Sequence, residues 1–223
     1  MTCGCLAEGT RLKIQGWFQE LLEQEVTELL GSVQKPALFR QTFELAMAYP
    51  AQEVSLQKLL GRLQESGNVN TIKHYLELLQ GAFLIRALHK YSGSAMKKRA
   101  SSPKLLPLNN ALVHAFRSPE DVDTNPEWYG RVFEAAVGAA LARSSGQIHY
   151  WREGKFEVDF VVELRKKIYA IEVKSTASRT SRGLERFVQL HPHCIPLMVD
   201  REKGIRILES ANVDNLLLND ILL

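Results

Sequence analysis

The sequence predicts an α/β (α+β) protein with two domains, and three observations lead to this fold class. Apolar residues recur at helical spacing through much of the first half of the chain. Short runs of strand-forming residues dominate the second half. Between the halves, residues 117–127 contain two prolines and four acidic residues without a regular period, as in a linker. We therefore expect a connector at 1–34, a first domain at 35–116, the linker at 117–127, and a second domain at 128–223.

The composition is that of an ordinary globular protein. Of the 223 residues, 45% are hydrophobic and 24% are charged, and no run of about 18 apolar residues could span a membrane. Residues 1–6 lack the basic and apolar regions of a secretory signal, so we expect a cytoplasmic protein. The net charge of +3 is too small to indicate nucleic-acid binding by itself. Three cysteines without a Cys-x-x-Cys pair favour reduced thiols over a disulfide framework or a zinc site.

Two amphipathic helices are predicted before residue 50. The first covers residues 11–33 and ends at Gly31 and Ser32. Pro36 fits the first turn of the second helix, which runs to Ala48 and stops before Pro50. The apolar face of the first helix, which we expect to pack on another surface, comprises Trp17, Leu21, Leu22, Val26, Leu29 and Leu30.

The next segment has the pattern of a winged helix-turn-helix. Ser55 is a suitable N-cap for a short helix that starts at Leu56, and a second helix begins near Asn70 and closes at Gly81. A short turn at 65–68 joins the two helices. A strand at 83–91, a polar basic loop at 92–102 and a returning strand at 104–109 complete the predicted wing.

The second domain follows the order α-β-β-β-α-β-β. A helix at 128–143 precedes strands at 148–152, 156–163 and 168–174, with a basic turn at 165–167. A helix at 184–190 and a strand at 195–199 follow. Lys203 and Gly204 suggest a turn before a last strand at 205–208, and an apolar tail helix begins near Val213. This order predicts an αβ domain.

Three carboxylates and a lysine of the second domain are candidates for chemistry. Phosphodiester hydrolysis with hard metal ions needs two or three converging carboxylates and a cation that stabilises the developing charge. Asp159 and Glu172 become cross-strand neighbours if their strands form a hairpin, and Lys174 shares the face of Glu172. Glu134 lies at the edge of the apolar arc of the preceding helix. The same spacing also suits a solvated sheet surface with a simple Glu172–Lys174 ion pair.

Several motifs in order carry a family resemblance. Asp159, then twelve residues, then Glu172-Val173-Lys174, after a helix bearing Glu134, resembles the PD-(D/E)xK restriction-endonuclease-like fold. Residues 59–91, 102–105, 130–134, 150–152 and 157–161 together resemble the C-terminal half of prokaryotic AAA-type ATPases, over about 35–208. That half is a winged helix joined to a nuclease-like domain of uncharacterised function. The resemblance therefore implies a winged helix-turn-helix followed by a restriction-endonuclease-like αβ domain with a mixed central sheet.

The resemblance also implies roles for single residues. Asp159 and Glu172 would bind Mg²⁺ or Mn²⁺, and the Val173 carbonyl would complete the metal's ligand shell. Lys174 would orient water or stabilise the charged transition state, and Glu134 would be the carboxylate from the helix. Because this fold also serves in binding, the resemblance does not by itself establish cleavage.

The ATPase half of the resembling family has no counterpart in this sequence. No G-x-x-x-x-G-K-[ST] phosphate-binding motif occurs, so we expect no ATP site in this chain. The chain is then a fragment, a split gene product or a degenerate descendant, and a P-loop ATPase domain or subunit is an expected partner.

DNA is the other expected partner. Lys73 and His74 lie on the exposed face of the predicted recognition helix, together with Thr71 and Glu77. The predicted wing carries the main basic group, which comprises Lys97, Lys98, Arg99 and Lys104. Our leading hypothesis is a DNA-associated, metal-dependent nuclease-like module of an AAA-type ATPase. The alternative is a catalytically silent module that binds DNA or protein and has a regulatory role.

Overall fold

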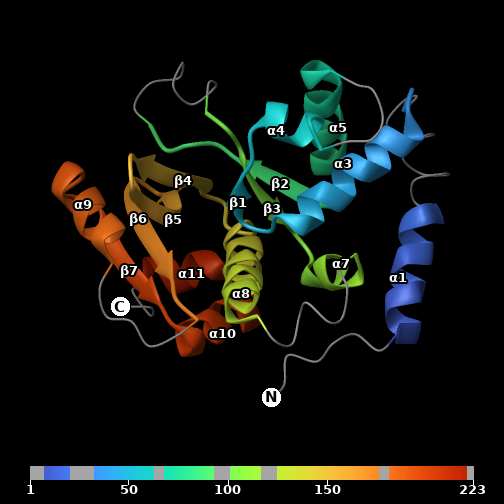
Figure 1. The fold of residues 1–223 in the computed structure, drawn as a ribbon. Coiled ribbons are helices and arrows are strands. Elements are labelled where there is room, and N and C mark those ends of the chain that lie inside the picture. The colour runs from blue at the N-terminus through green and yellow to red at the C-terminus, as the bar shows by residue number, and fades with distance from the viewer. Residues whose placement is uncertain are drawn as a thin grey trace. The chain divides into compact units, whose positions relative to one another are not determined.

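The computed structural model describes residues 8–20, 33–62, 68–92, 101–116, 125–175 and 181–219, which form a mixed α/β structure (Figure 1). The chain forms two compact units. The first contains Met1–Ala87 and Leu105–Val132, and the second contains Leu88–Lys104 and Phe133–Leu223. The three boundaries between the units fall inside two strands and one helix. Among the described residues, no helix has the length and apolar character needed to cross a membrane.

The first unit combines helices with a small sheet. The strands β1 (Gln52–Glu53), β2 (Ile85–Leu88) and β3 (Lys104–Pro107) form a sheet in the order β1-β3-β2. The side chains of Ser55, Asn68 and Asn109 cap the helices that follow them. The helices are α1 (Glu8–Glu20), α3 (Pro36–Ala48), α4 (Leu56–Leu60), α5 (Val69–Gly81) and α7 (Asn110–Ala115).

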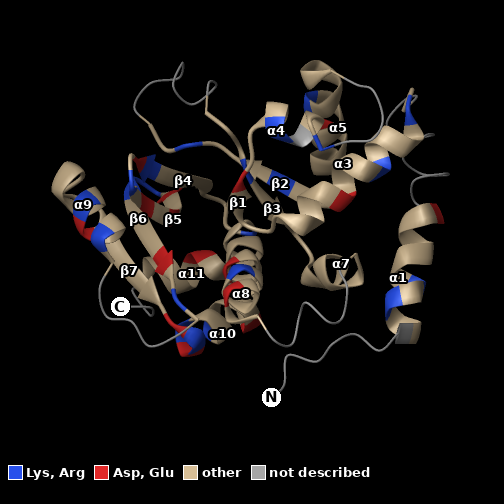
Figure 2. Cartoon of the chain, in the orientation of Figure 1, with Lys and Arg blue, Asp and Glu red and all other residues tan. Residues whose placement is uncertain are grey.

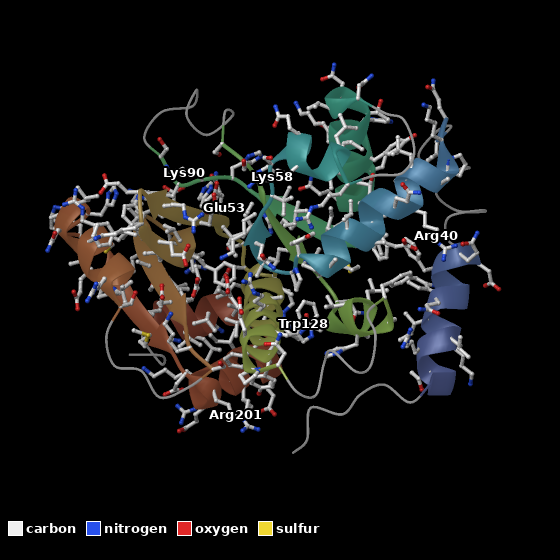
Figure 3. All side chains as sticks on the ribbon, in the orientation of Figure 1. Arg40, Glu53, Lys58, Lys90, Trp128 and Arg201 are labelled. Atoms are coloured by element: carbon white, nitrogen blue, oxygen red, sulfur yellow. The ribbon has the colours of Figure 1, made fainter. Side chains whose placement is uncertain are left out.

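An aromatic cluster lies at the centre of this unit. Phe18 of α1 stacks on Phe43 of α3 with ring centroids 3.7 Å apart, and Phe116 contacts both rings by its edge. The helical pattern predicts Trp17 on the buried face of α1, but Trp17 is 48% exposed and Phe18 is buried instead. The other five apolar residues predicted for that face lie outside the described residues. Trp128, which Figure 3 labels at the start of α8, is buried in the same unit.

Helix α5 closes at Gly81, as the sequence predicts, but the left-handed residue that follows it is not a glycine. Gly81 is the last helical residue, and Phe83 adopts the left-handed backbone conformation that often ends helices, with φ of 56°. Its neighbour Leu84 donates a backbone hydrogen bond to the Leu79 carbonyl, which closes the helix. Phe83, which is 81% exposed, has a Cβ atom. The positive φ of this residue after the helix therefore has a cost in conformational energy.

The second unit is built on a four-stranded mixed sheet, as predicted. Its strands are β4 (Gln147–Glu153), β5 (Phe156–Leu164), β6 (Lys167–Val173) and β7 (Ile195–Val199), in the spatial order β4-β5-β6-β7. The pairs β4–β5 and β5–β6 are antiparallel, and β6–β7 is parallel. The helices are α8 (Pro126–Leu141), α9 (Arg182–Leu190), α10 (Arg201–Glu209) and α11 (Val213–Leu218).

Tight turns set the register of the β5–β6 hairpin. Leu164 pairs with Lys167, so Arg165 and Lys166 form a two-residue loop, and both have positive φ. Such turns match the right-handed twist of the strands they join. The hairpin register brings Phe160 opposite Ile171 and continues toward Asp159 and Glu172.

The predicted strand at 205–208 is wrong, because these residues belong to helix α10. The Asp200 side chain caps this helix by accepting a hydrogen bond from the Lys203 backbone N–H. Gly204 is not a turn residue. A Cβ atom at this position would overlap the ring of Phe133 from α8, so the glycine permits close packing of the two helices. Figure 2 shows acidic and basic residues on α10 and on α9.

Helix α9 packs against the sheet of the second unit. Leu184 and Phe187 contact a cluster that includes Trp151, Val158 and Val161. At the start of the helix, a Cβ atom on Gly183 would overlap the Glu157 carbonyl of β5. This close approach fixes α9 beside the stretch of β5 that leads into Asp159.

Candidate functional site

The second unit brings five charged side chains into one cluster. Glu134 comes from α8, Asp159 from β5, and Glu172 and Lys174 from the end of β6. The fifth is Lys104, which begins β3. All five residues are candidates by sequence, Lys104 as a DNA contact and the other four as metal-site or catalytic residues.

A β-bulge positions Asp159. His149 pairs with Val161 and Trp151 pairs with Val158, so Asp159 and Phe160 both lie opposite the single residue Tyr150. The Asp159 Oδ2 atom accepts a hydrogen bond of 2.8 Å from the backbone N–H of Val173. The carboxylate is therefore held between β5 and β6, beside the residue that follows Glu172.

Glu172 and Lys174 form an ion pair at the end of β6. Lys174 Nζ lies 2.6 Å from Glu172 Oε1, and the lysine side chain is 36% exposed. Glu172 is buried, and its Oε2 atom has no hydrogen-bond partner among the residues that the structure describes. A buried carboxylate oxygen without a donor is costly, which marks this atom as a place for a ligand or water.

Lys104 is paired with Glu134. Its Nζ atom lies 2.5 Å from Glu134 Oε1 and donates to the Asp159 backbone carbonyl at 3.1 Å. The Lys104 side chain is only 8% exposed. Lys104 is predicted to contact DNA phosphates as part of the wing. In the structure it is instead the first residue of β3, where it is buried and paired with a carboxylate.

The proximity of the carboxylates changes their protonation. Burial, followed by repulsion from Asp159, raises the pKa of Glu172 to about 7, while Lys174 and the Ser181 hydroxyl oppose this shift. Burial and Asp159 also raise the pKa of Glu134, and Lys104 opposes the change. Burial alone would lower the pKa of Lys104, but the charges of Glu134 and Asp159 outweigh it and raise the pKa. Lys104 is therefore an ammonium at neutral pH.

The cluster fits a divalent metal in part. The unpartnered Glu172 Oε2 and the Asp159 Oδ1 atom, 3.9 Å from Lys104 Nζ, are hard oxygen ligands on neighbouring strands. Glu134 is already occupied by Lys104. Accordingly, no three His, Cys, Asp or Glu side chains within the described parts of the chain are spaced to hold one metal ion. The cluster thus leaves Glu172 Oε2 and Asp159 Oδ1 as candidate ligand atoms, which are too few to form a metal site by themselves.

Two further predicted residues do not join this cluster. Lys73 and His74 are exposed on α5 of the first unit, as the helical pattern predicts. Lys97, Lys98 and Arg99 lie outside the described residues. The five-residue cluster and the exposed face of α5 are therefore separate features of the molecule.

Comparison with known proteins identifies two domain families. The model of a domain of unknown function, DUF8612, matches residues 6–123, and that of a second, DUF4143, matches residues 129–218. The uncharacterized proteins Mb2031c of Mycobacterium bovis and Rv2008c of Mycobacterium tuberculosis are each 28% identical, over 91% of this chain and 49% of the relative. The chain thus spans about half the length of these curated relatives.

A solved structure, protein VC1899 from Vibrio cholerae, is 15% identical and has a TM-score of 0.22, with 84% of this chain and 51% of that chain covered. This likeness is too low to support a conclusion about the fold. The DUF8612 match, in contrast, spans 118 of the 223 residues. On that match, the chain belongs to the DUF8612 family.

Proposed function

We propose that the second unit is a metal-dependent nuclease-like module, associated with DNA and with an AAA-type ATPase. One observation carries the proposal. Asp159 and Glu172 lie on adjacent strands that the Asp159–Val173 hydrogen bond joins, and Lys174 lies directly beside Glu172. Two hard ligands and a cation next to them are the parts that metal-assisted phosphodiester hydrolysis needs.

The topology supports a restriction-endonuclease-like fold for this unit. The order α8-β4-β5-β6-α9-β7 agrees with the pattern that the resemblance implies, and the sheet is mixed. The paired strands β5 and β6 carry Asp159 and the Glu172-Val173-Lys174 motif, respectively. The acidic residues of the motif therefore lie on two strands of one hairpin, just beyond its last paired residues, Phe160 and Ile171.

Each residue of the motif would have a distinct task. Asp159 and Glu172 would hold Mg²⁺ or Mn²⁺, with the Val173 carbonyl as a further oxygen ligand. When bound, the metal would polarise the phosphate and lower the pKa of a water molecule. The Lys174 ammonium, half-exposed beside Glu172, would stabilise negative charge that develops on the phosphate oxygens.

The order of elements in the first unit supports the proposal that this unit is a winged helix-turn-helix. Its elements follow the order α3-β1-α4-α5-β2-β3, and the two longer strands lie next to each other in the sheet. Lys73 and His74 of α5 are exposed, as a recognition helix requires. We assign this unit to DNA contact through α5, and we assign Lys97, Lys98 and Arg99, which belong to the second unit, to phosphate contact.

An AAA-type ATPase is the proposed partner. The DUF4143 match supports this assignment, because that domain occurs in C-terminal regions associated with AAA-type ATPases. The mycobacterial relatives are about twice as long as the region that they share with this chain. A P-loop ATPase, on the same polypeptide or on another, would supply the nucleotide chemistry that this sequence lacks.

A thermal unfolding experiment tests the metal site. Mn²⁺ that binds only the folded chain should stabilise it by about 2.7 kcal/mol at a concentration of 100 times Kd. The Asp159→Ala variant should lose this stabilisation. An equal shift in native and variant chains, or no shift in the native chain, would refute the metal site.

A cleavage assay tests the reaction. Plasmid and single-stranded DNA are incubated with the native chain and Mg²⁺ or Mn²⁺, with and without an ATPase partner. Lys174→Ala should abolish cleavage while Mn²⁺ binding and folding remain largely intact. The double variant Asp159→Ala/Glu172→Ala reports contamination, since any cleavage that it retains comes from an impurity.

One observation favours the alternative of a catalytically silent binding module. The Lys104 ammonium contacts Glu134, so the helix carboxylate is not free for a metal. A native chain that binds DNA but never cuts it, even with an ATPase partner present, would support this alternative.

A further inference from the structure

We propose that Lys104 is the internal counter-ion of the carboxylate cluster and that it competes with a divalent cation for this cluster. The counter-ion role stands on the geometry of the described residues alone. The competition rests on the metal site proposed above. Both roles differ from the DNA contact that the sequence predicts for Lys104.

Among the described residues, the Lys104 ammonium contacts two carboxylates of the cluster and strand β5. Nζ lies 2.5 Å from Glu134 Oε1, 3.1 Å from the Asp159 carbonyl oxygen and 3.9 Å from Asp159 Oδ1. It also lies 4.8 Å from the centroid of the Phe160 ring, a favourable position for a cation. Lys104 thus binds α8 and β5 at the same time.

Burial makes this pairing obligatory. The exposed fractions of the Lys104, Asp159 and Glu134 side chains are 8%, 12% and 18%. A charge withdrawn from water to this extent persists only with an opposite charge and hydrogen bonds. Removal of Lys104 alone would leave Glu134 and Asp159 to repel each other without a cation between them.

The charge balance predicts competition with metal. With all groups ionised, Glu134, Asp159 and Glu172 outnumber Lys104 and Lys174 by a single negative charge. Without Lys104 the excess becomes two negative charges, which a divalent cation neutralises. A metal ion that approaches Asp159 also meets repulsion from the Lys104 ammonium, 3.9 Å from Oδ1. Lys104 therefore weakens metal binding while it stabilises the metal-free protein.

A double-mutant cycle tests the counter-ion role. Thermal unfolding in EDTA is measured for the native chain, Lys104→Met, Glu134→Gln and the double variant. Lys104→Met should lower Tm, and addition of Glu134→Gln should restore part of the loss, because the unpaired carboxylate is gone. Additive losses would overturn the counter-ion role. Lys166→Met is the matched control, since Lys166 is exposed at the tip of the β5–β6 hairpin.

Calorimetric titration with Mn²⁺ tests the competition at one fixed pH. Lys104→Met should bind Mn²⁺ about tenfold more tightly than the native chain, whereas Lys166→Met should not. If Lys104→Met fails to fold, the double variant is compared with Glu134→Gln, and removal of Lys104 should again tighten binding. Equal or weaker binding without Lys104 would overturn the competition.

The two experiments separate the possible failures. If no variant and no native chain binds Mn²⁺, the proposed metal site and the competition both fall, while the EDTA cycle still decides the counter-ion role. If the native chain binds Mn²⁺ and Lys104→Met binds no better, only the competition falls.

Discussion

The Asp159 carboxylate accepts a hydrogen bond from the Val173 backbone N–H at 2.8 Å, and this bond joins the two strands of the candidate site. The last paired residues of the hairpin are Phe160 and Ile171, so Asp159 lies one residue and Val173 two residues beyond them. A side chain here takes the place of the carbonyl that would continue the ladder. Asp159 therefore has a structural task in addition to its proposed chemical one.

This dual task predicts different effects for two substitutions of Asp159. Asp159→Ala should destabilise the second unit by about 1–3 kcal/mol, because it leaves a buried N–H without an acceptor. Asp159→Asn retains an acceptor oxygen and should cost less, although both variants lose Mn²⁺ binding. Urea unfolding in EDTA measures the difference. Equal stability of the two variants would show that the hydrogen bond contributes nothing.

The raised pKa of Glu172 predicts a pH dependence of stability in the absence of metal. Its pKa is about 7 in the folded chain and near 4.5 ordinarily, so the folded state retains the proton longer than the unfolded state. The stabilising contribution of this group is complete below about pH 4.5 and is lost as pH rises through about 7. Glu172→Gln should flatten the fall in unfolding free energy across this range. A variant that shows the same slope as the native chain would assign the effect to other groups.

Two glycines predict opposite results for one chemical change. Gly183→Ala should destabilise the second unit by about 1–3 kcal/mol or more, since the added Cβ meets the Glu157 backbone. Gly16→Ala is the matched control, because nothing lies within 4 Å of a Cβ at this exposed position of α1. It should stabilise its helix by about 0.5–1 kcal/mol. Differential scanning calorimetry of both variants checks the pair, and a tolerated Gly183→Ala would contradict the close packing of α9 on β5.

Replacement of Lys97, Lys98 and Arg99 by Ala should weaken duplex binding. The slope of log K against log salt should flatten by about 0.9 for each lost phosphate contact. Fluorescence anisotropy over a salt series measures both effects. The control changes Arg165 to Asn, Lys166 to Gly and Lys167 to Thr, which removes as many charges from a turn that accepts these residues. An unchanged slope would leave the loop without a role in DNA contact.

Local patterns in the sequence are sufficient to predict much of the fold. The helix at 36–48, the strand at 195–199 and the hairpin around residue 165 agree with the structure because capping residues, period and turn chemistry act over a few neighbours. The mixed sheet is also confirmed, although the parallel pairing of β6 with β7 across α9 is not a local property of the chain. Asp159 and Glu172 lie on adjacent antiparallel strands, as the predicted hairpin requires.

Where packing overrides a local pattern, the sequence prediction is wrong. Gly204 resembles a turn residue, yet it lies in α10, where the ring of Phe133, far away in the sequence, occupies the place of a side chain. Helix α7, which the sequence analysis does not predict, is a single short element of six residues capped by Asn109. Such elements are too short to show a clear period.

The amino-acid sequence is sufficient to identify the charged residues of the cluster and to place most of them on their strands or helices. Only the tertiary structure decided that Lys104 joins Glu134 and Asp159, which are 30 and 55 residues away along the chain. It also decided the bulge that sets Asp159 against Val173. Both arrangements follow from the burial of charge. Where the sheet and α8 exclude water, a buried ammonium needs a carboxylate and a buried carboxylate needs a hydrogen-bond donor. Partners that lie tens of residues apart in the chain leave no periodic pattern in the sequence that would reveal the pairing.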